Sequence, residues 1–154
     1  MIFNSFINTS KIISRLVKIR YLWYQYKGNF YTRNGISDDV LFSYYDNYNI
    51  KNDILVIFHG FSSKKESCLP LANILSDKYR IIIPDMIGHG DTKFLQTNNI
   101  DCKYDIKTQL NYLKTFIINT IGPDKKIHII GHSMGGLLAG CFAADYSNMI
   151  KSVI

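Results

Sequence analysis

Ser133 has a glycine two residues away on either side, in the stretch GHSMG formed by residues 131–135. The apolar run KIHII precedes this stretch, and the mostly small, apolar run GLLAGCFAA follows it. A buried strand that turns directly into a helix strains the middle residue, and the glycines leave room for the neighbouring strand and helix. The turn holds the serine hydroxyl at the carboxyl edge of the sheet, above a helix N-terminus. The pattern predicts a nucleophile elbow in which Ser133 attacks an acyl group.

A glycine-rich turn between a strand and a helix has two other interpretations. One is an ordinary connection without chemistry, and the other is a loop that binds phosphate. A phosphate-binding loop carries a lysine directly after its glycines. The next lysine after residue 135 is Lys151, which disfavours that loop. The strand before the turn and the helix after it favour the elbow.

A second glycine turn, His59-Gly60-Phe61, ends the apolar run DILVIF. Acyl transfer builds negative charge on an oxygen, and backbone N–H groups must already point at that oxygen. In a site of this kind one donor follows the nucleophile and the other lies in the loop after an earlier strand. We therefore expect the N–H groups of Phe61 and Met134 to form an oxyanion hole.

A serine nucleophile also needs a general base and a carboxylate that orients the base, here expected in the chain order Ser, Asp or Glu, His. Asp145 is the only acidic residue after Ser133, and no histidine follows it. The four histidines are expected to be structural: His59, His89, His128 and His132. Loss of the base costs about 10⁶-fold in turnover in a serine hydrolase. We therefore expect these 154 residues alone to be almost inactive.

Apolar patterns and turn residues predict the elements that position these residues. Strands are expected at 29–35, 40–47, 53–58, 80–85, 126–130 and 150–154, with a turn at Asn34-Gly35 between the first two. Helices are expected at 68–79, 105–122 and 135–146, and a loop at 86–94. Strands that alternate with helices favour right-handed crossovers. The expected fold class is α/β, a mostly parallel sheet with helices on both faces.

Residues 1–27 form a separate basic segment, because the first acidic residue of the chain is Asp38. Lys11, Arg15 and Lys18 share one face of a helix, and apolar side chains occupy most of the opposite face. Such a helix can lie on a membrane surface, serve as a mitochondrial transit peptide or pack against its own domain. All three interpretations stay open at this point.

The amino-acid composition of the chain argues against several classes of function. The net charge of +6 comes without an Arg-rich stripe, so we expect no nucleic-acid partner. Three cysteines without a CxxC pair argue against disulfides and zinc, and we expect no metal and no cofactor. The N-terminus makes a poor signal peptide. The expected location is intracellular and cytoplasmic, with membrane association or mitochondrial targeting open.

Residues 29–154 resemble the N-terminal part of an α/β-hydrolase fold enzyme of the lipase and esterase type. The matching stretches are LVIFHGFSS, YRIIIPDMIGHGDT and IHIIGHSMGGLLAGCFAA. Thr92 stands where this family commonly has serine. The resemblance implies that Ser133 is the nucleophile, that Phe61 and Met134 supply the oxyanion hole, and that the supporting motif residues are His59, Gly60, Gly88, His89, Gly90, Gly131, His132, Gly135 and Gly136.

The resemblance implies a substrate as well. GHSMGG is similar to the elbow of monoacylglycerol lipases and carboxylesterases, which implies a small-molecule or lipid ester. Relatives that open epoxides carry aspartate in place of Ser133. We expect the chain to be an N-terminal fragment, a split gene product or a decayed gene. A separate C-terminal chain that completes the fold is a candidate partner, and a non-catalytic binding protein is the alternative function.

Overall fold

The computed structural model describes residues 2–50, 52–95 and 104–154. Its helices are α1 (Ile2–Lys27), α2 (Leu69–Leu75), α3 (Ile106–Ile121) and α4 (Met134–Asp145), with 3₁₀ turns η1 (Lys65–Cys68) and η2 (Ser147–Met149). Its strands are β1 (Tyr31–Ser37), β2 (Val40–Asp46), β3 (Asp53–Phe58), β4 (Tyr79–Pro84), β5 (Lys93–Phe94), β6 (Ile127–Gly131) and β7 (Ile150–Val153). Apart from the two-residue strand β5, strands and helices alternate from β3 onward, as the sequence predicts.

One twisted sheet runs through the domain in the order β1-β2-β4-β3-β6-β7, and β5 pairs with β2. The pairs β4–β3, β3–β6 and β6–β7 are parallel, while β2 is antiparallel to β1, β4 and β5. Parallel strands carry their carboxyl ends to one edge of the sheet. The loops after β3, β4 and β6 therefore meet at that edge, where ligands bind in open α/β sheets.

Each face of the sheet has its own apolar core. α3 and α4 cover one face through the buried side chains Leu110, Leu113, Phe116, Ile117, Leu138, Ala139 and Phe142. α2 covers part of the other face with Leu69 and Ala72. This arrangement confirms the expected α/β fold class with helices on both faces.

The predicted turn at Asn34-Gly35 is wrong, because both residues lie inside β1 and pair with β2. The chain turns instead at Asp38 and Asp39, with Asp38 at a φ of 51°. Gly35 allows close packing, since a Cβ on it would make a tight contact of 3.1 Å with Cε2 of Phe116 in α3. In the sequence, a glycine that makes room for a helix looks the same as a glycine that makes a turn.

Two other boundaries differ from the prediction. The helix expected at 68–79 ends at Leu75, because the Asn47 and Asn49 side-chain amides each donate to the Ser76 carbonyl at 3.2 Å. That carbonyl lies where the helix would otherwise continue. The loop expected at 86–94 ends in the two-residue strand β5, which pairs with β2. Contacts from β2 and from the loop after it thus set both boundaries.

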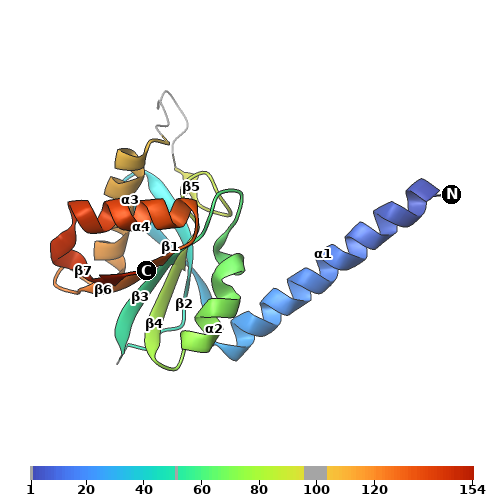
Figure 1. The fold of residues 1–154 in the computed structure, drawn as a ribbon, viewed down its shortest axis with the longest axis horizontal. Coiled ribbons are helices and arrows are strands. Elements are labelled where there is room, and N and C mark those ends of the chain that lie inside the picture. The colour runs from blue at the N-terminus through green and yellow to red at the C-terminus, as the bar shows by residue number, and fades with distance from the viewer. Residues whose placement is uncertain (1, 51, 96–103) are drawn as a thin grey trace.

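α1 projects from the domain and touches it only near its C-terminal end (Figure 1). The Asn73 side chain donates to the Tyr24 carbonyl at 2.7 Å, and Tyr21 and Tyr24 pack against the α2 side of the sheet. Residues 9–20 are exposed on all sides of the helix. The interpretation of α1 as a helix packed along its own domain therefore holds only for its last turns. Among the described residues, no helix has the length and hydropathy of a bilayer span.

Candidate active site

Ser133 is the residue at which β6 passes into α4. β6 ends at Gly131 and α4 begins at Met134, and Ser133 has φ 55° and ψ −117°. A side chain in this region of the backbone map costs on the order of 1–3 kcal/mol and persists only where the surroundings enforce it. Ser133 is exposed and makes no helix-capping bond. Within the described part of the chain, its hydroxyl has no hydrogen-bond partner.

Two glycines allow the strained turn. A Cβ on Gly131 would collide with the Gly135 carbonyl, and a Cβ on Gly135 would collide with the Phe58 carbonyl. The backbone of the turn is also fixed to the neighbouring strand, since the His132 N–H donates to the Phe58 carbonyl at 3.1 Å. The local sterics at these positions are therefore those that the sequence pattern predicts.

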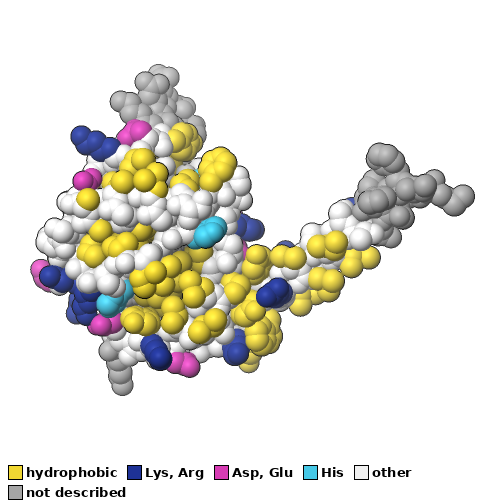
Figure 2. Space-filling view, in the orientation of Figure 1, with side chains coloured by type: hydrophobic (Ala, Val, Ile, Leu, Met, Phe, Trp, Pro, Cys, Tyr) yellow, Lys and Arg dark blue, Asp and Glu magenta, His cyan; other side chains and the backbone are white. Residues whose placement is uncertain are grey.

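The loop after β3 passes directly beside this turn. A Cβ on Gly60 would lie 3.0 Å from His132 Nδ1 and 3.4 Å from Ser133 Cβ. Ser133 and Phe61 therefore border the same cavity, which has a volume of about 420 Å³. Its wall is largely apolar, with Ile57, Cys68, Leu71 and Ile130. In Figure 2, hydrophobic side chains gather on the surface between β6 and α2, where this cavity opens.

His59 fixes the orientation of the peptide between Gly60 and Phe61 in that loop. The ring is fully buried, and its Nε2 accepts the Met86 N–H at 2.9 Å. Nδ1 therefore carries the proton and donates to the Gly60 carbonyl at 2.8 Å. Burial is the main cause that lowers the pKa of His59 and keeps the ring neutral. Since C=O and N–H point in opposite directions across a trans peptide, this bond turns the Phe61 N–H away from the ring.

Both N–H groups expected to stabilise an oxyanion are free. Neither the Phe61 N–H nor the Met134 N–H has an acceptor within the residues that the structure covers. Met134 is the first residue of α4, so its amide is one of the unpaired donors at a helix N-terminus. A free donor beside an unpaired serine hydroxyl is an arrangement that can bind a carbonyl oxygen.

The Gly88-His89-Gly90 loop lies beside Phe61. Gly88 and Gly90 have φ values of 79° and 54°, and the His89 ring packs edge-on against the rings of His59 and Phe61.

Thr92 follows the loop, and its buried hydroxyl donates to the Asp85 carbonyl at 2.8 Å and accepts the Ser43 N–H at 3.0 Å. A hydroxyl suffices for both bonds, so threonine replaces serine here without loss of these contacts.

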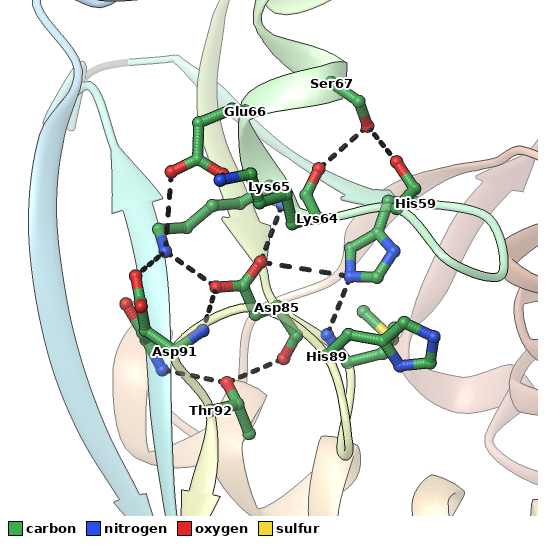
Figure 3. Close-up of polar contacts among 12 residues, drawn as sticks. His59, Lys64, Lys65, Glu66, Ser67, Asp85, His89, Asp91 and Thr92 are labelled. Carbon is green, nitrogen blue, oxygen red and sulfur yellow. Dashed lines mark hydrogen bonds and ion pairs between the residues drawn. The ribbon is translucent and has the colours of Figure 1, made fainter. Parts of the chain in front are cut away.

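Sequence reasoning missed a buried ionic cluster behind the site. Lys65 is 1% exposed and Asp85 fully buried, and their side chains meet at 2.6 Å (Figure 3). Lys65 lies in the polar stretch SSKKES, which is typical of solvated surface. A usable signal was present for Asp85, since it directly follows the buried strand β4 at the carboxyl edge of the sheet.

His132 is the neighbour of Ser133 and lines the same cavity, whereas His128 and His89 make their polar contacts elsewhere. His128 lies near the amino end of β6, where its Nδ1 contacts Ser152 Oγ at 2.7 Å and its Nε2 lies 3.6 Å from Asp53. His89 Nδ1 lies 3.2 Å from the Ile87 carbonyl oxygen. No histidine of the described chain hydrogen-bonds to the Ser133 hydroxyl. Nor do the described residues contain a cluster of three or more potential metal ligands.

Comparison with known proteins finds lipases among the relatives of this chain. A monoacylglycerol lipase, abhd6-A of Xenopus laevis, is 32% identical over 149 residues, which cover 90% of this chain and 40% of that protein. Lipase 1 of Psychrobacter immobilis is 30% identical over 110 residues, which cover 71% of this chain and 33% of that lipase. The chain thus spans well under half the length of these relatives.

A solved structure and a family model both identify the fold of this chain. The structure of lip1 from Acinetobacter baumannii AYE superposes with a TM-score of 0.79 over 89% of this chain and 44% of that one, at 24% identity. The family model described as the alpha/beta hydrolase fold matches residues 53–154, well over half of the chain. The matched range includes β3, β4, β6 and the turn at Ser133. The chain belongs to the alpha/beta hydrolase fold family.

Proposed function

We propose that this protein is a serine hydrolase that cleaves a carboxylic ester of a lipid through an acyl-enzyme on Ser133. The observation that carries the proposal is the backbone at Ser133, which presents an unpaired hydroxyl from a strained turn beside two free N–H groups. Strain at a non-glycine residue with a free nucleophilic atom is typical of a catalytic position.

In the proposed reaction the Ser133 oxygen attacks the ester carbonyl, and the carbonyl oxygen becomes an oxyanion. The N–H groups of Phe61 and Met134 would donate to that oxyanion, a contribution worth about 10²–10³ in kcat for one donor. The bond to the alcohol then breaks, the alcohol leaves with a proton, and water hydrolyses the ester of Ser133. A general base must take the serine proton in the first step and return it to the alcohol. No histidine of the described residues hydrogen-bonds to Ser133, so we propose that the base comes from the C-terminal chain that completes the fold.

The apolar cavity supports a lipid ester. Ile57, Leu71 and Ile130 line the space beside Ser133 and offer contact to hydrocarbon. Cys68 adds to this wall as a neutral thiol, because burial raises its pKa to about 11. Relatives of at least 30% identity are named as lipases, including monoacylglycerol lipases. The acyl chain would lie along this wall.

A fluorophosphonate probe tests the proposal on the native protein. We expect one adduct per chain, mapped to Ser133 by peptide mass spectrometry, and loss of both labelling and hydrolysis of monoacylglycerol in Ser133→Ala. Ser63→Ala is the matched control, because Ser63 lines the same cavity and should label normally. Labelling that persists in Ser133→Ala would overturn the assignment. If the protein with its fold and general base complete binds monoolein but is neither labelled nor active, it is the non-catalytic binding protein instead.

We infer in addition that α1 attaches the domain to an anionic membrane surface. Ile12, Leu16, Ile19, Trp23 and Tyr26 follow one another at spacings of four and three residues, and each is more than half exposed. The basic side chains at positions 11, 15 and 18 run along one flank of this stripe, where they would reach lipid phosphates. Hydrophobic side chains line the projecting helix in Figure 2. A lipid hydrolase gains access to its substrate at such a surface.

A further inference from the structure

The loop that carries Phe61 is fastened at both ends to the segment after β4 (Figure 3). At its start, His59 Nε2 accepts the Met86 N–H. At its end, Asp85 accepts the Lys65 N–H through Oδ1 at 2.7 Å and the Lys65 ammonium through Oδ2 at 2.6 Å. Only residues 60–64 lie between the two attachments, so their position depends on both.

The second attachment depends on a buried cation. Lys65 Nζ also donates to Asp91 at 2.7 Å and lies 3.7 Å from Glu66 Oε1. Burial is the largest single influence and lowers the pKa of Lys65, but the bonds to Asp85 and Asp91 outweigh it and raise the pKa above its ordinary value. Lys65 is therefore charged in the folded protein, and removal of its charge would leave Asp85 as an unpaired buried carboxylate.

Asp85 is itself fixed to the rigid part of the domain. Its backbone N–H donates to the Ser43 carbonyl in β2 at 2.9 Å, and its carbonyl accepts the Thr92 hydroxyl. Its carboxylate also accepts the Asp91 N–H at 2.9 Å. Through Asp85, Lys65 links the loop after β3 to β2 and to the segment that follows β4.

We propose that Lys65 is a positioning residue, whose ion pair with Asp85 holds residues 60–64 so that the Phe61 N–H faces the oxygen bound beside Ser133. The inference deepens the proposed esterase function and rests on it. Lys65 does not line the cavity, so substrate binding should not depend on it. Because loss of one oxyanion donor costs about 10²–10³ in kcat, a displaced donor should cost about 10–100-fold.

The test compares Lys65→Met with Lys64→Met in the native full-length protein. Lys64 is the neighbouring lysine, with a side chain 59% exposed and one ion pair at 3.9 Å. We expect Lys65→Met to lower kcat and the fluorophosphonate labelling rate about 10–100-fold with KM within twofold, and Lys64→Met to match wild type. A purely structural role would change the melting temperature and leave kcat per folded molecule unaltered, and that result would overturn the inference.

Two further measurements apply if Lys65→Met does not fold or if Ser133 is unreactive. If Lys65→Met does not fold, Lys65→Met/Asp85→Asn removes both buried charges together, and a wild-type kcat in the folded double variant contradicts the inference. If wild-type Ser133 proves unreactive, the esterase proposal fails, and amide hydrogen exchange of residues 60–64 still decides the positioning role. We then expect exchange at least tenfold faster in Lys65→Met than in Lys64→Met, and equal rates would refute it.

Discussion

At the scale of single residues, the candidate site depends on positions where nearby backbone atoms restrict the side chain or fix its orientation. Gly131 and Gly135 allow the turn, Ser133 occupies a strained conformation, and His59 is held neutral between two backbone groups. None of these requirements is a property of the residue type alone. Each follows from a neighbouring backbone atom that lies within contact distance.

Gly135→Ala should destabilise the protein by about 1–3 kcal/mol or more, because its Cβ would overlap the Phe58 carbonyl in an already packed site. Gly140→Ala in the same helix is the matched control, since outside the adjacent backbone of α4 no heavy atom lies within 4 Å of the position that its added methyl group would take. Alanine there should stabilise α4 by about 0.5–1 kcal/mol. Urea unfolding of both variants measures the difference, and equal stabilities would contradict the packing at residue 135.

The depressed pKa of His59 predicts a loss of stability in mild acid. The unfolded chain takes up a proton near the ordinary value of 6.5, whereas the folded chain resists it until lower pH. The contribution is complete above pH 6.5 and declines as the pH falls, by at most about 1.4 kcal/mol per pH unit. Unfolding free energies between pH 7.5 and 5.5 should therefore fall in wild type and fall less in His59→Gln. Parallel curves would show that His59 does not titrate on unfolding.

At the scale of elements, α1 and the loop after β3 are the parts whose surroundings differ most from what their sequences suggest. α1 keeps its apolar stripe in solvent, although helices with such a stripe usually bury it. The loop after β3 carries the polar stretch SSKKES, yet Lys65 within it is buried. Both features bear on function, through the proposed membrane surface and the proposed positioning of Phe61.

The proposed membrane attachment predicts that Ile12→Ser/Leu16→Ser/Ile19→Ser will lower binding to vesicles of phosphatidylglycerol and phosphatidylcholine at least tenfold. Burial of one such side chain contributes about 1.5–3 kcal/mol, so three partly buried ones suffice for this effect. Ile36→Ser is the control, since Ile36 is 55% exposed in β1 and lies off the helix. Co-sedimentation measures the binding. Equal sedimentation of the triple variant and wild type would show that α1 does not attach the protein to the membrane.

At the scale of the whole molecule, the topology assembles the candidate site. β3, β4 and β6 are parallel neighbours, so the loops that contain Phe61, His89 and Ser133 leave the sheet at the same edge. Their sequence separation is up to 74 positions, from 59 to 133, yet Gly60 lies against the turn at Ser133. His128 shares β6 with that turn but lies near the opposite edge, with Asp53 and Ser152.

The sequence by itself determined the features whose causes are local. The apolar runs specified β3, β4 and β6, and Gly122 ended α3 as expected. The glycines around Ser133 implied a strand-to-helix turn, because the collisions that they avoid arise within a few residues or with the adjacent strand. The catalytic roles of Ser133, Phe61 and Met134 stay predictions that the labelling experiment tests.

Only the tertiary structure decided the features that depend on distant partners. Gly35 lies inside β1, where it pairs with β2 and leaves room for Phe116 from far along the chain, and α2 stops at Leu75 because Asn47 and Asn49 bind Ser76. Lys65 is buried because Asp85 and Asp91 surround its ammonium group. The physical reason is common to all three, since a side chain's environment is set by the atoms that the fold brings to it, and local residue patterns do not encode those atoms.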